Sequence, residues 1–126
     1  MNVRKLAWVG TRTNEAAAMA DFLERVLGLS PRHDVDGMWV FTLPDRSKVE
    51  VFGPEYDGNE HFTTGPVVEF FVDDVAAATE ELRAAGVSII FGPVHFEEDD
   101  VAWVHFRAPD GNVYGLTQGR DVAPGP

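Results

Sequence analysis

The sequence predicts an α+β fold made of two tandem βαβββ modules, at residues 3–54 and 65–118, with a loose tail at residues 119–126. An internal repeat and the same order of strand and helix signals in both halves support this fold. The chain has 126 residues, of which 44% are hydrophobic, so it is long enough to bury the core of one compact domain.

The internal repeat consists of matching segments at a nearly constant offset. Residues 43–52 resemble residues 108–117, which begin 65 positions later. Gly28 matches Gly86, which lies 58 positions later. The small drift in the offset indicates that two copies of one unit carry loops of different length.

The first module begins with a strand and a helix. Residues 5–12 are rich in apolar side chains, which favours a strand. Residues 15–27 place apolar side chains along one face, which predicts a helix. Thr13 or Asn14 is available as the N-cap of this helix, and Gly28 is a typical C-terminal stop.

The rest of the first module reads as a β-hairpin. Residues 38–43 and 48–52 are strand candidates, and the Pro-Asp pair between them favours a turn. With the strand and helix before them, and about three strands expected after each helix, the module has the order βαβββ.

The second module repeats this order. Residues 67–72 predict a strand and residues 75–85 a helix, which Gly86 ends. Asp73 and Asp74 supply the N-cap, and their charge suits the positive end of the helix dipole. Three further strand candidates complete the module, at residues 87–91, 101–107 and 113–117.

The charge balance restricts the expected partners. Ten Lys and Arg stand against 21 Asp and Glu, so with a net charge of −11 we expect neither nucleic acid nor a membrane surface as a partner. No apolar stretch approaches a membrane span and no signal peptide is visible, so a cytoplasmic protein is expected. The absence of Cys excludes disulfides, thiolate-bound zinc and a cysteine nucleophile.

Four segments in a characteristic order and spacing carry a resemblance to a known family: residues 6–11, 22–29, 70–75 and 109–112, the last reading Pro-Asp-Gly-Asn. Together they make the chain resemble the glyoxalase, bleomycin-resistance and extradiol-dioxygenase superfamily, also called the vicinal oxygen chelate proteins. The resemblance covers roughly residues 5–118, which is nearly the whole chain.

This resemblance implies two modules whose sheets curl around a cavity, and it implies a homodimer, because many members are dimeric. Metal-using members hold a divalent ion on four inward-facing side chains, and the corresponding positions here are Trp8, Glu50, Val67 and Gly115. Among these, Glu50 alone has a side chain that can bind a metal ion. Because one carboxylate is too few for a tight site, no metal cofactor is expected.

Strand alternation extends this set of inward-facing positions. If Glu50 faces the cavity, so does Phe52, and if Val67 does, so do Glu69 and Phe71. An aromatic lining with a few polar groups suits a small aromatic or cationic ligand. The expected ligand-binding residues are Trp8, Arg12, Phe52, Phe71 and Trp103, and the catalytic candidates are Glu50, Glu69 and His105.

The polar candidates admit more than one interpretation. Glu50 and Glu69 could act as acid and base or bind a cationic ligand, or each could form a solvated ion pair with Lys48 or Arg12. His105 lies in a strand pattern, so it points either into the cavity, where it could act as a base, or to the outer surface.

The remaining polar features are expected outside the site. His33 and His61 lie in polar segments and are expected to be exposed. His95 follows a Gly-Pro pair in a loop that is a candidate lid. The four acidic residues at positions 97–100 lack the spacing of a calcium loop, so they predict a solvated turn.

Three functional hypotheses follow. The first is a metal-free protein that binds a small aromatic or cationic molecule, similar to the bleomycin-resistance type. The alternative is an enzyme of the same superfamily, a lyase, isomerase or dioxygenase, that uses Glu50 with Glu69 or His105. The third is a regulatory or scaffold dimer without a small ligand.

Overall fold

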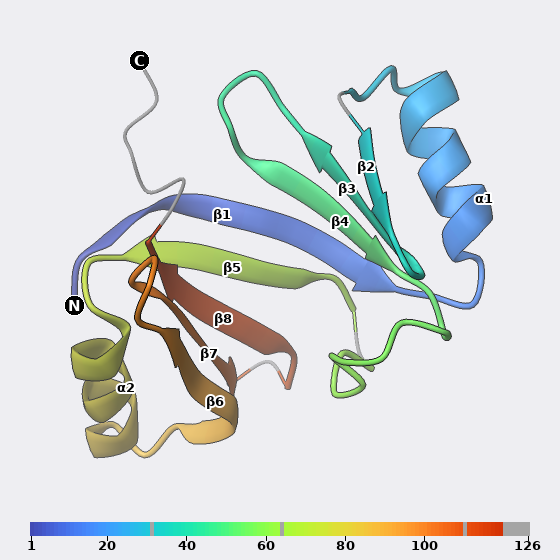
Figure 1. Cartoon of the computed structure of the whole chain (residues 1–126). Helices are drawn as coiled ribbons and strands as arrows, with labels where there is room; N and C mark the ends of the chain where they lie inside the picture. Colours follow the sequence, from blue (N-terminus) through green and yellow to red (C-terminus); the bar gives the residue numbers. More distant parts are fainter. Residues whose placement is uncertain (31, 64, 110, 120–126) are drawn as a thin grey trace.

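A computed structural model of the chain describes residues 1–30, 32–63, 65–109 and 111–119. The fold is α+β, as the sequence predicts: one open, mixed sheet of eight strands carries two short helical segments (Figure 1). The strand order is β2-β3-β4-β1-β5-β8-β7-β6, which places the two modules side by side in one sheet. The expected tail lies outside the described residues beyond position 119.

The two modules meet at the centre of the sheet. There β1 (Val3–Arg12) pairs antiparallel with β5 (Val67–Val72), as Figure 1 shows in blue and yellow-green. On the outer sides, β1 pairs parallel with β4 (Lys48–Phe52), and β5 pairs parallel with β8 (Val113–Gln118). The equivalent pairings in the two halves match the internal repeat of the sequence.

The outer strands differ most from the sequence prediction. The short edge strand β2 (Arg32–Val35) was not predicted; it pairs antiparallel with β3 (Met38–Thr42). At the other edge, β6 (Ser88–Phe96) pairs antiparallel with β7 (Val101–Arg107). The β6 strand is longer than predicted, because register shifts around Gly92-Pro93 let pairing resume beyond that point. His95 therefore lies in a strand, which corrects the expected lid loop.

The first helical segment follows the prediction closely in position. The α-helix α1 (Ala16–Asp21) continues as the π-helical turn η1 (Phe22–Val26). Neither predicted N-cap residue, Thr13 nor Asn14, caps the helix: the N-cap position is Glu15, without a side-chain capping hydrogen bond, and Oγ1 of Thr13 accepts the backbone N–H of Glu15 at 3.0 Å in the turn before it. Gly28 follows the last turn with a φ of 70°, a conformation that glycine adopts without strain.

The second helix, α2 (Val75–Ala84), is capped by one of its two aspartates. The Asp74 side chain accepts the backbone N–H of Ala77 at 3.0 Å. Asp73 instead accepts a 3.0 Å hydrogen bond from the guanidinium of Arg4, so it ties the start of β1 to the helix. The two carboxylates that the sequence places together thus have separate roles.

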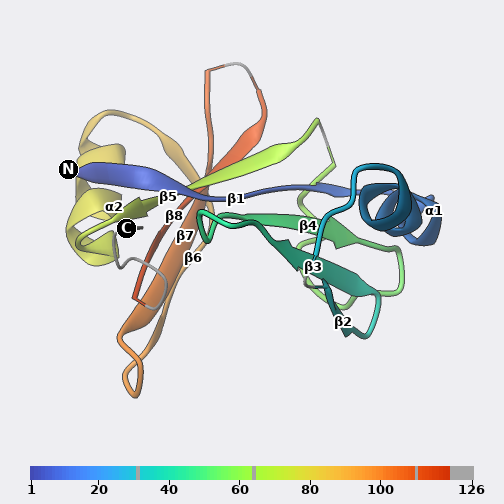
Figure 2. The ribbon, with the colours of Figure 1, turned by 90° about the horizontal axis from the view of Figure 1, so that it is seen from above.

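The core lies in three clusters. One packs α1 against β3 and β4, and a second packs α2 against β7 and β8. Figure 2 shows the two helices at opposite ends of the molecule, with β1 and β5 between them. The third cluster lies between the modules and includes Phe52, Phe62, Val67 and Val113. Within the described part of the chain, no helix is long and apolar enough to cross a membrane.

Candidate functional site

Four strands, β4, β1, β5 and β7, direct the side chains of Glu50, Trp8, Glu69 and His105 to one face of the sheet. Trp8 on β1 lies opposite Glu69 on β5, and Glu50 on β4 pairs with β1 two positions beyond Trp8. On the other side, Gly115 on β8 lies between Glu69 and His105 in the register of the sheet. The pairing of β1 with β5 therefore brings side chains of both modules together.

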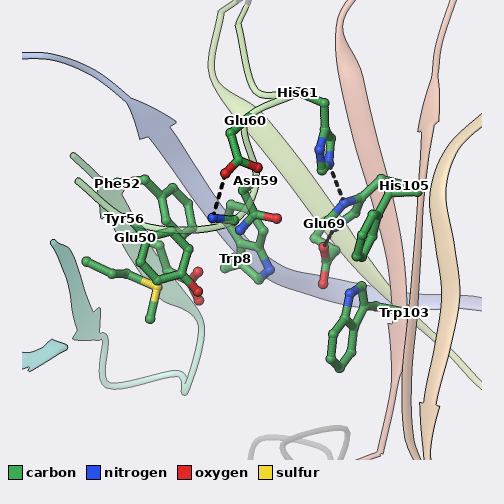
Figure 3. Close-up of a pocket in the computed structure, with 13 residues that line it drawn as sticks. Trp8, Glu50, Phe52, Tyr56, Asn59, Glu60, His61, Glu69, Trp103 and His105 are labelled. Atoms are coloured by element: carbon green, nitrogen blue, oxygen red, sulfur yellow. Dashed lines mark hydrogen bonds and ion pairs between the residues drawn. The ribbon is translucent and has the colours of Figure 1, made fainter. Parts of the chain in front are cut away.

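These side chains line a cavity of about 500 Å³, shown in Figure 3. A second cavity of about 490 Å³ shares Trp8, Glu50 and Glu69 with the first and adds Lys48 and Phe71. In Figure 3, Glu50 and Glu69 lie on opposite sides of the Trp8 indole. The residues that line the first cavity are Trp8, Met38, Glu50, Phe52, Tyr56, Gly58, Asn59, Glu60, His61, Glu69, Phe91, Trp103 and His105.

Glu69 belongs to a chain of hydrogen bonds. Its Oε2 lies 3.1 Å from Nε2 of His105, and Nδ1 of His105 lies 2.9 Å from Nε2 of His61 (Figure 3). Glu69 and His105 are buried, with 5% and 3% of their surfaces exposed, whereas His61 is half-buried. Buried ionisable groups of this kind are stable in a protein only when they have partners.

Gly115 makes room for this buried pair. A Cβ atom at position 115 would lie 2.5 Å from Oε2 of Glu69 and 2.9 Å from Cδ2 of His105. Both distances are far below van der Waals contact. Any residue with a side chain would therefore displace the carboxylate or the imidazole.

Glu50 has a different environment. The residue is half-buried, and its carboxylate makes no hydrogen bond within the described part of the chain. Burial raises the pKa of Glu50 to about 7; the negative charge of Glu69 adds to this increase, and Lys48 opposes it. No buried side-chain polar atom of the described residues lacks a partner, so the Glu50 oxygens face open space in the cavity.

His61 is held neutral by its surroundings. Burial lowers the pKa of His61, followed by the charge of His105, and Arg107 and Arg12 lower it further, while Glu60 opposes them. The ring therefore remains unprotonated at neutral pH and can both donate and accept a hydrogen bond.

Aromatic side chains form the walls. The Trp8 ring lies 5.9 Å from the rings of both Phe52 and Phe62, measured between centroids. On the other side, Phe91 stacks on both imidazoles, 5.4 Å from His61 and 5.7 Å from His105. These contacts surround the polar groups with low-dielectric material, which strengthens the hydrogen bonds among them.

Of the other predicted ligand-binding residues, Trp103 and Phe71 each line a cavity, whereas Arg12 does not. Trp103 lines the first cavity and packs against Phe96, with ring centroids 5.4 Å apart. Phe71 lines the second cavity, and the Lys5 ammonium lies 5.6 Å from its ring centroid. Arg12 lies outside the residues that line the two cavities.

Arg12 instead fixes the loop that carries His61. Its guanidinium donates to the carbonyl oxygens of Gly58 at 2.7 Å and Tyr56 at 3.2 Å. The loop between β4 and β5 is thereby folded back over the sheet, which brings His61 to His105. His61 is thus a site residue that the sequence interpretation missed, because the expectation of an exposed polar loop was wrong at this position.

The other predicted surface groups lie away from the site. His33 is exposed on β2, and Nε2 of His95 pairs with Asp100 at 2.9 Å at the surface. Asp100 ends the acidic turn of residues 97–100, as expected for a solvated connection. None of these groups lines the cavity around Trp8.

The sequence resemblance relates four positions, Trp8, Glu50, Val67 and Gly115, to the ligands of metal-using proteins. These four residues do not supply enough ligands for a metal ion. The indole of Trp8 has no free lone pair for a cation. Val67 has an apolar, fully buried side chain, and Gly115 has no side chain. In residues 1–30, 32–63, 65–109 and 111–119, no three His, Asp or Glu side chains are grouped so as to hold a metal ion. The residues present therefore do not fit the ion of that family.

Comparison with known proteins relates the sequence to one family. Residues 5–115 match the model of the Glyoxalase/Bleomycin resistance protein/Dioxygenase superfamily. No curated protein matches the chain.

Solved structures share the fold at low sequence identity. Methylmalonyl-CoA epimerase from Mycobacterium tuberculosis is 17% identical, with a TM-score of 0.67, over 93% of this chain and 89% of the epimerase. The hypothetical protein BH1468 from Bacillus halodurans C-125 is 18% identical, with a TM-score of 0.69, over 94% and 96% of the two chains. The Mn(II)-bound glyoxalase from Novosphingobium aromaticivorans is 21% identical, with a TM-score of 0.72, over 98% of this chain and 40% of the glyoxalase.

Proposed function

We propose, from the premise that this chain belongs to the Glyoxalase/Bleomycin resistance protein/Dioxygenase superfamily, that it binds a small aromatic or cationic molecule in the cavity around Trp8, without a metal ion. Members of one fold family have diverse activities, so the proposal rests on the chemistry of this cavity.

The observation that carries the proposal is the unpartnered carboxylate of Glu50. Glu50 is half-buried, and its carboxylate faces the cavity without a hydrogen bond from the described residues, so it has lost part of its hydration without a protein partner in exchange. A ligand that donates an N–H or brings a positive charge would supply the missing partner. The pKa of Glu50 is about 7, so a cationic ligand beside it would shift this carboxyl group toward its ionised form.

The walls suit the flat part of such a ligand. Trp8 and Trp103 offer ring faces on either side of the cavity, and Phe52 and Tyr56 extend the apolar surface. Aromatic and cationic groups both interact favourably with such rings. The formal net charge of −11 adds a long-range attraction for cations.

The test is a fluorescence titration of the full chain with aromatic amines and their uncharged isosteres. Trp8 and Trp103 line the cavity, and Trp39 packs in the α1 cluster, so a W39F background reports on the cavity. At pH 8, we expect an amine to bind and E50Q to weaken it by about tenfold or more, since a charged hydrogen bond is lost.

A matched control separates local from general charge effects. E98Q removes the same charge from the exposed acidic turn, so we expect it to leave the affinity unchanged. If E50Q and E98Q behave alike, or if no amine or isostere binds, the proposal is wrong.

A second candidate function, acid–base isomerisation, is favoured by the different environments of two carboxyl groups. Glu50 has a pKa of about 7, whereas Glu69 is paired with His105. One carboxylate could remove a proton from an acidic C–H of a bound molecule while the other returns a proton to the opposite face. The structural likeness to an epimerase supports only the fold at this identity, so this candidate rests on the two carboxyls.

Proton exchange into a substrate tests this candidate directly. In heavy water, we expect deuterium to appear at the carbon next to the carbonyl of a 2-substituted thioester or acid, followed by NMR. E50Q should abolish the exchange, whereas E98Q should not. Binding without exchange across such a panel would leave the first proposal standing and exclude the second.

A further inference from the structure

We propose that His105 and His61 form a proton relay that connects the buried carboxyl group of Glu69 with water at Nδ1 of His61. The relay goes beyond ligand binding, because it concerns the exchange of one proton and does not depend on which molecule the cavity holds. It rests on the two consecutive hydrogen bonds, of 3.1 Å and 2.9 Å, that join the three side chains.

The geometry allows two complete arrangements of protons. When Glu69 is ionised, His105 donates Nε2–H to the carboxylate, so its Nδ1 must accept the Nε2–H of His61. When Glu69 is protonated, each hydrogen bond reverses its direction. In both arrangements, each of the two hydrogen bonds has one donor and one acceptor, which is the condition for a relay.

The path has an open end at His61. Nδ1 of His61 makes no hydrogen bond within the described residues, and no buried side-chain polar atom of these residues lacks a partner. The ring is half-buried in the loop between β4 and β5. Nδ1 of His61 therefore contacts water. Glu69, at the other end of the relay, borders both cavities.

The proton balance of one transfer is simple. A proton from water binds Nδ1 of His61, and the proton on its Nε2 passes to Nδ1 of His105. The proton on Nε2 of His105 then passes to Oε2 of Glu69. Both imidazoles end neutral in the other tautomer, and one carboxylate has gained one proton. Transfer in the opposite direction restores the starting state.

Aromatic side chains flank both imidazole rings of the relay. Phe91 stacks on both rings, and Phe62 packs against them from another side. The charged groups that act on His61 are Glu60, which favours its protonation, and Arg107, Arg12 and His105, which oppose it. Neutral rings can pass a proton through, whereas a ring that stayed protonated would stop the transfer.

The relay gives the two carboxyl groups of the cavity different access to protons. Glu69 can exchange its proton through the imidazoles as long as Nδ1 of His61 remains in contact with water. Glu50 has no such connection, because its carboxylate has no hydrogen bond within the described part of the chain. Its proton must exchange through the cavity itself.

The test uses NMR of the histidine rings in the full chain labelled with ¹⁵N. In the wild type, we expect a ¹⁵N–¹⁵N coupling across the hydrogen bond between Nε2 of His61 and Nδ1 of His105. H61Q is the decisive variant, because the Gln amide can still donate to His105 but cannot pass a proton on. We expect H61Q to keep the tautomer of His105 and to slow solvent exchange of its ring proton by about tenfold or more, since exchange then requires opening of the structure.

H95Q is the matched control, because His95 pairs with Asp100 at the surface and lies outside the relay. We expect H95Q to leave the exchange at the wild-type rate. Equal exchange in H61Q and wild type would overturn the relay and leave His61 a structural role. The wild-type coupling needs no variant, so its absence would overturn the relay even if H61Q failed to fold.

Discussion

Nε2 of His105 lies 3.1 Å from Oε2 of Glu69, and the only residue between them in the register of the sheet is Gly115. The buried pair exists because position 115 has no side chain. Position 115 is one of the four positions that the sequence resemblance relates to the ligands of metal-using proteins, and a glycine there supplies no ligand.

Substitution of this glycine should disrupt the pair. We expect G115A to lower the free energy of unfolding by about 1–3 kcal/mol, because its Cβ would lie 2.5 Å from the Glu69 carboxylate. Urea unfolding measures the stability, and NMR of the His105 ring reports its hydrogen bond. A G115A variant as stable as the wild type, with the ring signals of His105 unchanged, would contradict the described geometry.

The raised pKa of Glu50 predicts how stability depends on pH. Between the ordinary pKa of 4.5 and the folded pKa of about 7, the folded chain holds this proton more firmly than the unfolded chain. The resulting stabilisation is complete below pH 4.5 and is lost as the pH rises through 7. We expect the ionised carboxylate to cost up to about 3 kcal/mol at pH 8.

E50Q removes this titration and serves as the comparison. We expect E50Q to be more stable than the wild type at pH 8, with the difference shrinking toward pH 5. Urea unfolding at a series of pH values measures both. A constant difference between the two proteins across this range would show that Glu50 has an ordinary pKa.

Arg12 should support the site through the loop and not through the ligand. We expect R12M to lower the free energy of unfolding by about 1–3 kcal/mol, because the carbonyls of Tyr56 and Gly58 lose their charged donor. The NMR coupling between His61 and His105 should weaken as well. R25M is the control, since the exposed pair of Arg25 with Asp21 contributes little; similar losses in both variants would refute this role.

The two aspartates before α2 offer a test of local structure. D74A should lower the free energy of unfolding by about 1 kcal/mol, because it removes the cap on the N–H of Ala77. D73A removes an exposed pair with Arg4, so its effect should be within about 0–1 kcal/mol. Thermal unfolding compares the two, and a larger loss in D73A would reverse the assignment of the cap.

Most of the fold could be predicted from local signals. The helices have apolar faces and glycine stops, and the central strands are apolar runs between turns. The edge strand β2 (Arg32–Val35) could not be predicted in this way, because it is short and mostly polar, so its pairing with β3 defines it. The extension of β6 was hidden by Gly92-Pro93, which reads as a loop.

The site was predictable where it depends on strand alternation. Glu50 was expected in the cavity from the family resemblance, and Glu69 from its alternation with Val67, a position that the same resemblance supplied; both line the cavity. His61 could not be assigned, because its position depends on a long loop that Arg12 holds over the sheet. The buried Phe62 beside it was the available signal, since an aromatic side chain in a polar segment marks a point where the loop packs on the core.

The most direct measurement for the central claim is the metal content of the untagged, dialysed chain by elemental mass spectrometry, before and after incubation with zinc, nickel and manganese. The cavity is proposed to work through Glu50 and Glu69 without an ion, since Trp8, Val67 and Gly115 supply no ligand. We expect the retained metal to stay far below one ion per chain. A stable ion in every chain would contradict the proposal and place the carboxyl groups in a metal centre.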